Sequence, residues 1–233
     1  MLLAVSGIDT YYGSSHILQE ISLSVAEGEI AALLGRNGVG KTTTLRSIMG
    51  LSPPRKGSVR FAGEEIRGLP ADAIARKGVA YVPDDYRIFP DLTTDENLEI
   101  ARRLSPRKGV WDRERVFDLF PRLSELSRSK GINLSGGEKK MLGIGRGLMA
   151  NPSLILLDEP AEGLAPLVVA NLVEVLGKIR EQGVTILLAD QNLKFCRKVC
   201  GRGTILEKGR VQFEGKMEEI WNNEEIIRKY LVV

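Results

Sequence analysis

Cysteine and histidine are both scarce in this chain of 233 residues, which contains two cysteines and one histidine. Cys196 and Cys200 lie four positions apart on an expected helix, a spacing that puts both on one face but suits a disulfide poorly. His16 is distant from both in the sequence, so a metal site shared by the three has little support. We therefore expect two reduced, packed thiols and no disulfide scaffold.

Long apolar runs and long basic runs are also missing. No stretch approaches the roughly 20 apolar residues that a membrane-crossing helix needs, and the N-terminal residues lack a basic segment and include an acid at Asp9. The 33 lysines and arginines are interspersed with 30 acids, for a net charge of +3, and form no run typical of a nucleic-acid tail. We therefore expect a cytosolic protein with no nucleic-acid partner, in which partner chains supply any membrane role.

A glycine-rich segment, residues 35–43, reads GRNGVGKTT and fits the phosphate-loop pattern G-x-x-x-x-G-K-[ST]. It follows an apolar run, residues 30–34, that is expected to be a strand, and it precedes residues 44–49, which can continue as a helix. Glycines let the backbone wrap closely around an anion, so that loop and helix N–H groups point at the β-phosphate of a nucleotide. The alternative is a glycine-rich turn that only caps a helix.

This loop predicts specific roles for its residues. Lys41 adds a positive charge near the β- and γ-phosphates, and Thr42 offers its hydroxyl to Mg²⁺. The residues expected to bind ATP are Gly35, Arg36, Asn37, Gly38, Val39, Gly40, Lys41, Thr42 and Thr43.

A second acidic motif follows another apolar run, because the four aliphatic residues 154–157 end at Asp158, Glu159 and Pro160. A strand of a parallel sheet delivers the residues at its C-terminal end into the crevice where ligands bind, and the phosphate loop also opens there. Asp158 is therefore expected to hold Mg²⁺, and Glu159 to orient and polarise the attacking water as general base. The alternative is an ordinary helix N-terminus with Asp158 as its cap.

The order of patterns predicts an α/β fold in one domain, residues 1–233. Residues 1–83 and 151–233 alternate strand and helix patterns, which indicates a P-loop NTPase core with a mixed, mainly parallel sheet, preceded by an antiparallel β subdomain. Residues 84–150 carry more charge and have apolar residues at helical spacing, as far as Leu104 in the first helix. We interpret this middle part as an inserted helical subdomain.

Between the two motifs lies a second glycine pair, in the signature segment, residues 135–138, which follows Leu134 and reads SGGE. Glycines at the start of a helix, with serine in front, make another anion-binding terminus, because backbone N–H groups and the helix dipole both favour a phosphate. One nucleotide cannot easily need both phosphate sites of one chain. We therefore expect a head-to-tail dimer in which each ATP lies between the phosphate loop of one chain and the signature segment of the other.

These motifs, GRNGVGKT, LSGGE and LILLDEP, resemble in order and spacing those of the ATP-binding cassette (ABC) ATPases, and the resemblance covers essentially the whole chain. It implies the ABC ATPase fold, with ATP and Mg²⁺ as cofactors. It also implies that Tyr12 stacks on adenine, with a strand aromatic packed on the sheet as the alternative and Tyr11 as the less suitable stacker. The residues that would contact the ATP of the opposite subunit are Ser135, Gly136, Gly137 and Glu138.

Further stretches, TYYGSSHIL, RIFPDLTTDENL and LDEPAEGLAP, resemble the smaller ATPase subunit of branched-chain amino acid importers. This resemblance implies two transmembrane permease subunits, a homodimer or a heterodimer with a sister ABC ATPase, a solute-binding protein as indirect partner, and a peripheral place on the cytoplasmic face of the membrane. Relatives that import urea, short amides or aromatic acids share much of this sequence, so the solute stays open. Two competing functions are a soluble cassette protein that acts on nucleic acid or the ribosome, and a nucleotide-binding regulator without turnover.

Four positions depart from the general family pattern. Asp84 stands where glutamine or glutamate is usual, and we expect it to contact the metal through an extra water. Ala165 stands where most cassettes have aspartate, so one polar contact across the dimer should be missing. Glu138 replaces glutamine, and we expect it to face outward and cap its helix. Gln191 replaces the usual histidine as a catalytic contact.

The glutamine at 191 predicts the pH behaviour of hydrolysis. Gln191 can hydrogen-bond the γ-phosphate but cannot titrate near neutral pH. We therefore expect hydrolysis with Glu159 as base and without titration of a histidine. A change in turnover at about pH 6 to 7 that is insensitive to replacing His16 would lack an explanation. Residues 87–89, an arginine followed by Ile88 and Phe89, are candidates for docking a membrane partner, with local packing as the alternative.

Overall fold

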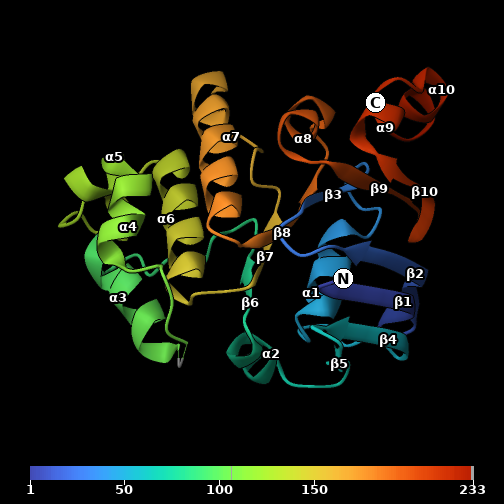
Figure 1. Ribbon diagram of the computed structural model, residues 1–233, viewed down its shortest axis with the longest axis horizontal. Helices are drawn as coiled ribbons and strands as arrows, with labels where there is room; N and C mark the ends of the chain where they lie inside the picture. The colour runs from blue at the N-terminus through green and yellow to red at the C-terminus, as the bar shows by residue number, and fades with distance from the viewer. Residues whose placement is uncertain (106, 232–233) are drawn as a thin grey trace.

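The computed structural model describes residues 1–105 and 107–231, and its strands form two separate sheets (Figure 1). The first sheet is antiparallel with strand order β2-β1-β4-β5. Its strands are β1 (Leu3–Tyr12), β2 (Ser15–Val25), β4 (Lys56–Phe61) and β5 (Glu64–Glu65). β1 pairs with β2 from Leu3 opposite Val25 to Tyr12 opposite Ser15, which confirms the antiparallel start expected from the sequence.

The second sheet has six strands in the order β10-β9-β3-β8-β7-β6. They are β3 (Ile30–Leu34), β6 (Val79–Val82), β7 (Leu154–Asp158), β8 (Thr185–Asp190), β9 (Arg202–Glu207) and β10 (Arg210–Lys216). All neighbours run parallel except β10, which is antiparallel to β9. Every residue of β3, β7 and β8 is buried, as expected for near-continuous aliphatic strands that are covered on both faces.

Helices from outside the middle of the chain cover this sheet. They are α1 (Lys41–Ile48), α2 (Ala71–Lys77), α7 (Pro166–Glu181), α8 (Leu193–Val199), α9 (Met217–Trp221) and α10 (Glu224–Ile226), and a π-helical turn (Ile227–Leu231) follows α10. α1 contacts both sheets, because Leu45 joins one hydrophobic cluster with Leu33 of β3 and Ile8 of β1. The phosphate loop therefore leads into a helix that is buried between the two sheets.

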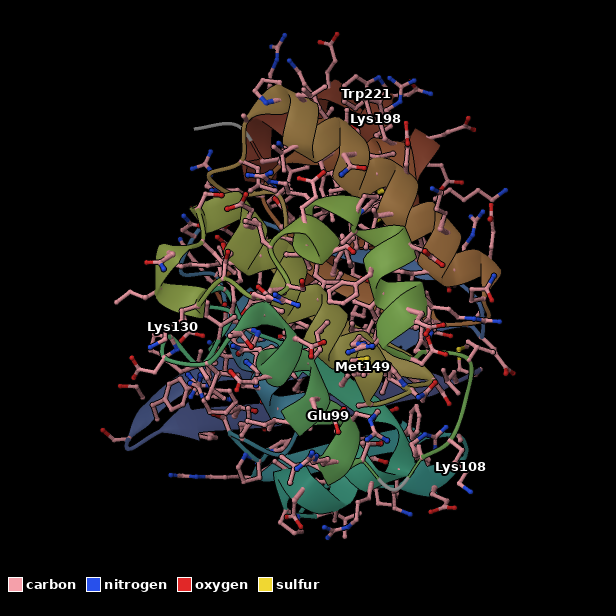
Figure 2. The ribbon with its side chains drawn as sticks, turned by 90° about the vertical axis from the view of Figure 1, so that its left-hand side faces the viewer. Glu99, Lys108, Lys130, Met149, Lys198 and Trp221 are labelled. Carbon is pink, nitrogen blue, oxygen red and sulfur yellow. The ribbon has the colours of Figure 1, made fainter. Side chains whose placement is uncertain are left out.

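The middle of the chain is helical, with α3 (Thr94–Leu104), α4 (Arg113–Leu119), α5 (Pro121–Glu125), a 3₁₀ turn (Gly131–Asn133) and α6 (Gly136–Met149). Figure 2 shows this layer in front, with Glu99 on α3 and Met149 at the end of α6. Leu98 is buried in the cluster that α3 shares with α6, but Leu104, the last residue of α3, is 79% exposed. The buried apolar face of α3 therefore ends before the last residue of the helix. The division into core and helical subdomain remains our interpretation.

Two expectations from the composition can be compared with the structure. Cys196 and Cys200 are free and buried, which confirms the prediction of packed thiols. Within residues 1–105 and 107–231, no helix is both long and apolar enough to cross a bilayer.

Candidate functional site

The phosphate loop connects β3 to α1 and depends on glycine at three positions. Gly35, Gly38 and Gly40 have φ angles of 149°, 80° and 113°, in the region that favours glycine. A Cβ on Gly35 would lie 2.6 Å from the carbonyl oxygen of Leu206, and one on Gly40 would lie 2.7 Å from a methyl group of Leu18. Neither position therefore accepts a side chain. Of the remaining loop residues, Arg36 and Asn37 are exposed, and Val39 and Thr43 are buried.

Lys41, the first residue of α1, is only 4% exposed and folds back over the loop. Its Nζ donates hydrogen bonds to the carbonyl oxygens of Gly35 (2.9 Å) and Arg36 (3.0 Å) and lies 3.4 Å from Oε1 of Glu159. The expected phosphate-binding charge and the expected general base are thus neighbours. This contact joins residues that are more than 100 positions apart in the chain.

Asp158 ends β7 as a buried carboxylate with two hydroxyl partners. Its Oδ1 accepts a hydrogen bond from the Thr42 hydroxyl (3.1 Å) and its Oδ2 accepts one from the Tyr81 hydroxyl (3.0 Å). Burial raises the pKa of Asp158 to about 6, with smaller contributions in the same direction from the charges of Asp84 and Glu159, whereas the two hydrogen bonds lower it. Burial and the nearby Asp158 carboxylate also raise the pKa of Tyr81.

These oxygens fit a magnesium ion that arrives with a nucleotide. In the part of the chain that the structure describes, no three His, Cys, Asp or Glu side chains form a complete metal cage. Mg²⁺ usually takes one or two protein ligands and fills its octahedral shell with phosphate oxygens and waters, which matches the pair of Thr42 and Asp158. Asp84 is exposed and accepts a hydrogen bond from the N–H of Asp85 (2.9 Å), and its contact with the metal through a water stays a prediction.

Glu159 has a left-handed backbone with φ of 47°, which is unusual for a residue other than glycine. Its N–H donates to the carbonyl oxygen of Ala189 (2.8 Å), which fixes it to the neighbouring strand β8. Glu162 shares a hydrogen bond between side chains with Glu159, and this bond is the main cause that raises the pKa of Glu162 to about 7. Glu162 therefore stays protonated up to about neutral pH, and in that state its carboxyl group can donate this hydrogen bond to Glu159.

The register of the sheet explains why these groups meet. Leu34 pairs with Asp190, Asp158 with Ala189, and Val82 with Leu157, so β3, β6, β7 and β8 end at the same edge. The phosphate loop, Glu159, Gln191 and Asp84 all lie just beyond this edge. Gln191 is exposed there.

Tyr12 and Tyr11 at the end of β1 differ in their surroundings. The Tyr12 side chain is 44% exposed, and its hydroxyl lies 3.1 Å from the Ser52 hydroxyl. Tyr11 is stacked on His16 with ring centroids 4.1 Å apart, and the Arg55 guanidinium lies 4.4 Å from the Tyr11 ring centroid. Tyr12 therefore has the freer ring, which favours it over Tyr11 as the adenine contact, although that role stays a prediction.

The signature segment starts α6 with a reciprocal cap. The Ser135 hydroxyl accepts from the N–H of Glu138 (3.3 Å), and the Glu138 carboxylate accepts from the N–H of Ser135 (2.8 Å) and from Arg122 Nε (3.0 Å). The Ser135 N–H is the main cause that lowers the pKa of Glu138. This geometry confirms the expected capping role of Glu138. In Figure 1, α6 lies among the helices α3 to α5 and α7, apart from α1, which follows the phosphate loop.

Three residues of this region were not found from the sequence. Tyr81 bonds Asp158, Glu162 bonds Glu159, and Lys140 donates to the turn after β7. The sequence did offer a signal for Tyr81, because its hydroxyl group interrupts an otherwise apolar strand. This strand, β6, pairs with β7, which ends at Asp158. Glu162 lies three residues after Glu159, a spacing that brings side chains together when a turn follows.

Comparison with known proteins agrees with this geometry. The sequence profile of the family described as ABC transporter matches residues 18–162. The chain is 38% identical over 231 residues to the high-affinity branched-chain amino acid transport ATP-binding protein BraG of Pseudomonas aeruginosa, with 99% of each chain covered. It is 35% identical over 234 residues to the lipopolysaccharide export system ATP-binding protein LptB of Haemophilus influenzae, covering 99% of this chain and 97% of that one.

A solved structure shares the fold. It is a dimeric post-hydrolysis state of an ATP-binding cassette bound to ADP and Pi, with a TM-score of 0.82 and 25% identity, and the similarity covers 93% of this chain and 99% of that one. The profile match and the two relatives at 35% identity or more, together with this shared fold, cover nearly the full length of the chain. The chain therefore belongs to the ABC transporter family, as an ATP-hydrolysing subunit of a transporter.

Proposed function

We propose that Glu159 is the general base for ATP hydrolysis in this subunit and that the hydrolysis powers import of branched-chain amino acids. The observation that carries the assignment is the meeting of Lys41, Thr42, Asp158 and Glu159 at one edge of the sheet, through the contacts Lys41–Glu159 and Thr42–Asp158. These groups supply the positive charge, the metal oxygens and the base that phosphoryl transfer to water requires.

Each residue has a distinct part in this mechanism. Loop N–H groups and Lys41 bind the phosphates. Thr42 and Asp158 would hold Mg²⁺, which would supply positive charge to the phosphates. Glu159 accepts a hydrogen bond from the attacking water and then its proton. Gln191 donates a hydrogen bond to the γ-phosphate from the neighbouring strand end.

We also propose that the ATP site is completed by the signature segment of a second subunit. Gly136 and Gly137 are helical, and a Cβ on Gly136 would meet nothing within 4 Å, whereas one on Gly137 would meet only Leu164 and Val168, at 3.6 and 3.8 Å. Neither glycine is thus required by its own chain, although glycine in a helix costs about 1 kcal/mol relative to alanine. Close approach of a phosphate from another subunit explains why both positions lack side chains.

The loop after β6 is proposed as the contact with transmembrane permease subunits. Phe89 is 41% exposed, and the Arg146 guanidinium lies 4.7 Å from its ring centroid, whereas Ile88 packs against the core of the helical part. Tyr86 and Arg87 both have positive φ angles, 53° and 44°. Strained backbone beside an exposed aromatic residue suits a docking site that moves. We favour Phe89 over Ile88 as the docking residue.

The solute is proposed from the relatives. BraG is named for branched-chain amino acid transport and LptB for lipopolysaccharide export, so export of lipopolysaccharide is the competing function, and urea, short amides and aromatic acids are competing imported solutes.

Uptake in cells separates these functions. A strain that lacks the gene is expected to lose uptake of labelled leucine, isoleucine and valine, and the wild-type chain should restore it whereas a Glu159→Gln chain should not. Unlabelled urea, short amides and aromatic acids should fail to compete. Normal uptake in the deletion strain would contradict the proposal, and a lipopolysaccharide defect there would favour export.

The carboxyl pair predicts a pH dependence that does not involve histidine. Below about pH 7 Glu162 is protonated and donates a hydrogen bond to the Glu159 carboxylate, which weakens Glu159 as a base. Because the raised pKa of Glu162 is about 7, kcat should rise with pH through that value and be about tenfold lower at pH 6 than at the plateau.

Two substitutions test whether Glu162 causes this rise of kcat with pH, which is called the limb below. Glu162→Ala removes the proton donor and should abolish the change in kcat near pH 7 at a high value, whereas Glu162→Gln keeps an amide donor and should abolish the change at a low value. Titration of ATP itself is common to all variants, so the ratio of wild-type to variant kcat is the readout. A His16→Gln control should keep the limb, and an unchanged limb in both Glu162 variants would exclude the pair as its source.

A further inference from the structure

Lys140 on α6 is a buried lysine that the mechanism above does not use. Its side chain is only 1% exposed and is among the largest fully buried side chains of the described chain. Its Nζ donates hydrogen bonds to the carbonyl oxygens of Glu159 (2.9 Å) and Glu162 (2.7 Å) and lies 5.0 Å from the centroid of the Tyr86 ring. A buried ammonium is stable only when it is well paired, and here both hydrogen bonds go to the turn that begins with Glu159.

A second group also holds this turn, residues 159–162. The buried Asp190 carboxylate accepts hydrogen bonds from the N–H groups of Ala161 (3.1 Å) and Asn192 (2.8 Å). Glu159 needs such support, because its left-handed backbone is costly for a residue with a Cβ. Removing the Lys140 contacts would leave two carbonyl oxygens without these donors and would leave the turn with the Asp190 contact alone among the two.

We infer that Lys140 is a positioning residue that holds the Glu159 carboxylate in its reactive orientation by fixing the backbone of residues 159–162 from α6. Among the described residues, the ammonium group of Lys140 donates to the turn and makes no hydrogen bond to the phosphate loop or to Asp158, so it acts through Glu159. It lies two positions after the signature segment and also contacts Tyr86 in the proposed docking loop. The inference rests on the proposed role of Glu159.

Lysine suits this position because of the length of its side chain and the number of its hydrogen-bond donors. Its long stem crosses the apolar interior from α6, and the ammonium group offers three donors that can satisfy two carbonyl oxygens at once. Methionine would fill a similar volume without a donor. Glutamine would keep donors on a shorter side chain.

The test measures kcat and ATP affinity of Lys140→Met and Lys140→Gln in the ATPase-active protein, with Lys178→Met on the exposed face of α7 as control. We expect Lys140→Met to lower kcat by about tenfold to a hundredfold, because small misplacement of a catalytic group has effects of that size. Lys140→Gln should lower it less. The Kd for ATP should change less than about threefold in both, since the phosphate-loop contacts are untouched.

The same Lys140→Met change in a Glu159→Gln background separates positioning from a general structural effect. If Lys140 acts through Glu159, it should slow single-turnover hydrolysis there by less than about twofold, whereas independent effects multiply. ADP binding and the thermal unfolding midpoint show whether a variant folds, and Lys140→Gln carries the comparison if Lys140→Met does not. Wild-type kcat in a folded Lys140→Met protein, or an equally large loss in the Glu159→Gln background, would overturn the inference. Wild-type hydrolysis by Glu159→Gln alone would instead refute the proposed function.

Discussion

Replacing Glu159 by glutamine is expected to lower kcat for ATP hydrolysis by about a hundredfold or more, because the amide cannot accept a proton from water. ATP should still bind. Lys41 and the loop glycines make the phosphate contacts, and the only described contact of the Glu159 side chain with them is the 3.4 Å approach to the Lys41 ammonium. Loss of that partner changes the position of Lys41 without removing its charge.

The measurement is steady-state phosphate release, together with binding of a fluorescent ATP analogue. Glu174→Gln on the exposed side of α7 changes the same charge away from the site and should keep wild-type values for both. A Glu159→Gln protein that loses affinity and turnover in parallel would point to a binding role for Glu159. A protein that keeps its turnover would show that another group accepts the proton.

Mixing two inactive variants is expected to restore hydrolysis if the site is shared between subunits. A Lys41→Met chain has a defective phosphate loop and an intact signature segment, whereas a Gly137→Asp chain has the reverse. Within its own chain, a Cβ on Gly137 would meet only side chains, at 3.6 Å or more. A dimer of one chain of each kind has one intact site and one site with both defects.

Single-turnover hydrolysis is the appropriate readout, because its amplitude counts every site that hydrolyses one ATP, even if the site cannot turn over repeatedly. With random pairing, half of the dimers are mixed and each has one intact site, so about a quarter of the wild-type amplitude should return. Each variant alone should remain inactive. A single chain carrying both substitutions, mixed with either variant, is the control that should not recover. Failure of the first mixture to exceed this control would contradict a composite site.

Most of the fold could be predicted because the buried strands appear in the sequence as continuous runs of apolar residues. Residues 30–34 match β3 at both ends. The aliphatic run at 154–157 matches the start of β7 and stops one residue before its end at Asp158. Buried parallel strands need apolar residues on both faces, so their pattern is nearly continuous. The apolar pattern of α3 was less informative at its end, where Leu104, the last residue of the helix, is exposed.

The site was predicted where a motif specifies a local backbone and missed where it depends on long-range contacts. Glycine spacing specifies the phosphate loop, and Gly35 and Gly40 are indeed held at positive φ. Tyr81 reaches Asp158 only because β6 and β7 pair in a particular register, with Tyr81 opposite Leu156. Lys140 looks like a surface lysine in the sequence, and only the packing of α6 against the turn after β7 buries it.

The position of β3 in its sheet also bears on how the protein is made. β3 ends at residue 34, yet its two neighbours are β8 and β9, which begin at Thr185 and Arg202. During synthesis, β3 therefore has no strand partner of its own sheet until about four-fifths of the chain has been made. The antiparallel pair β1–β2 can form at once from local contacts, whereas the nucleotide site must wait for distant ones. The long interval leaves an aliphatic strand unpaired on the nascent chain, where aggregation competes with folding.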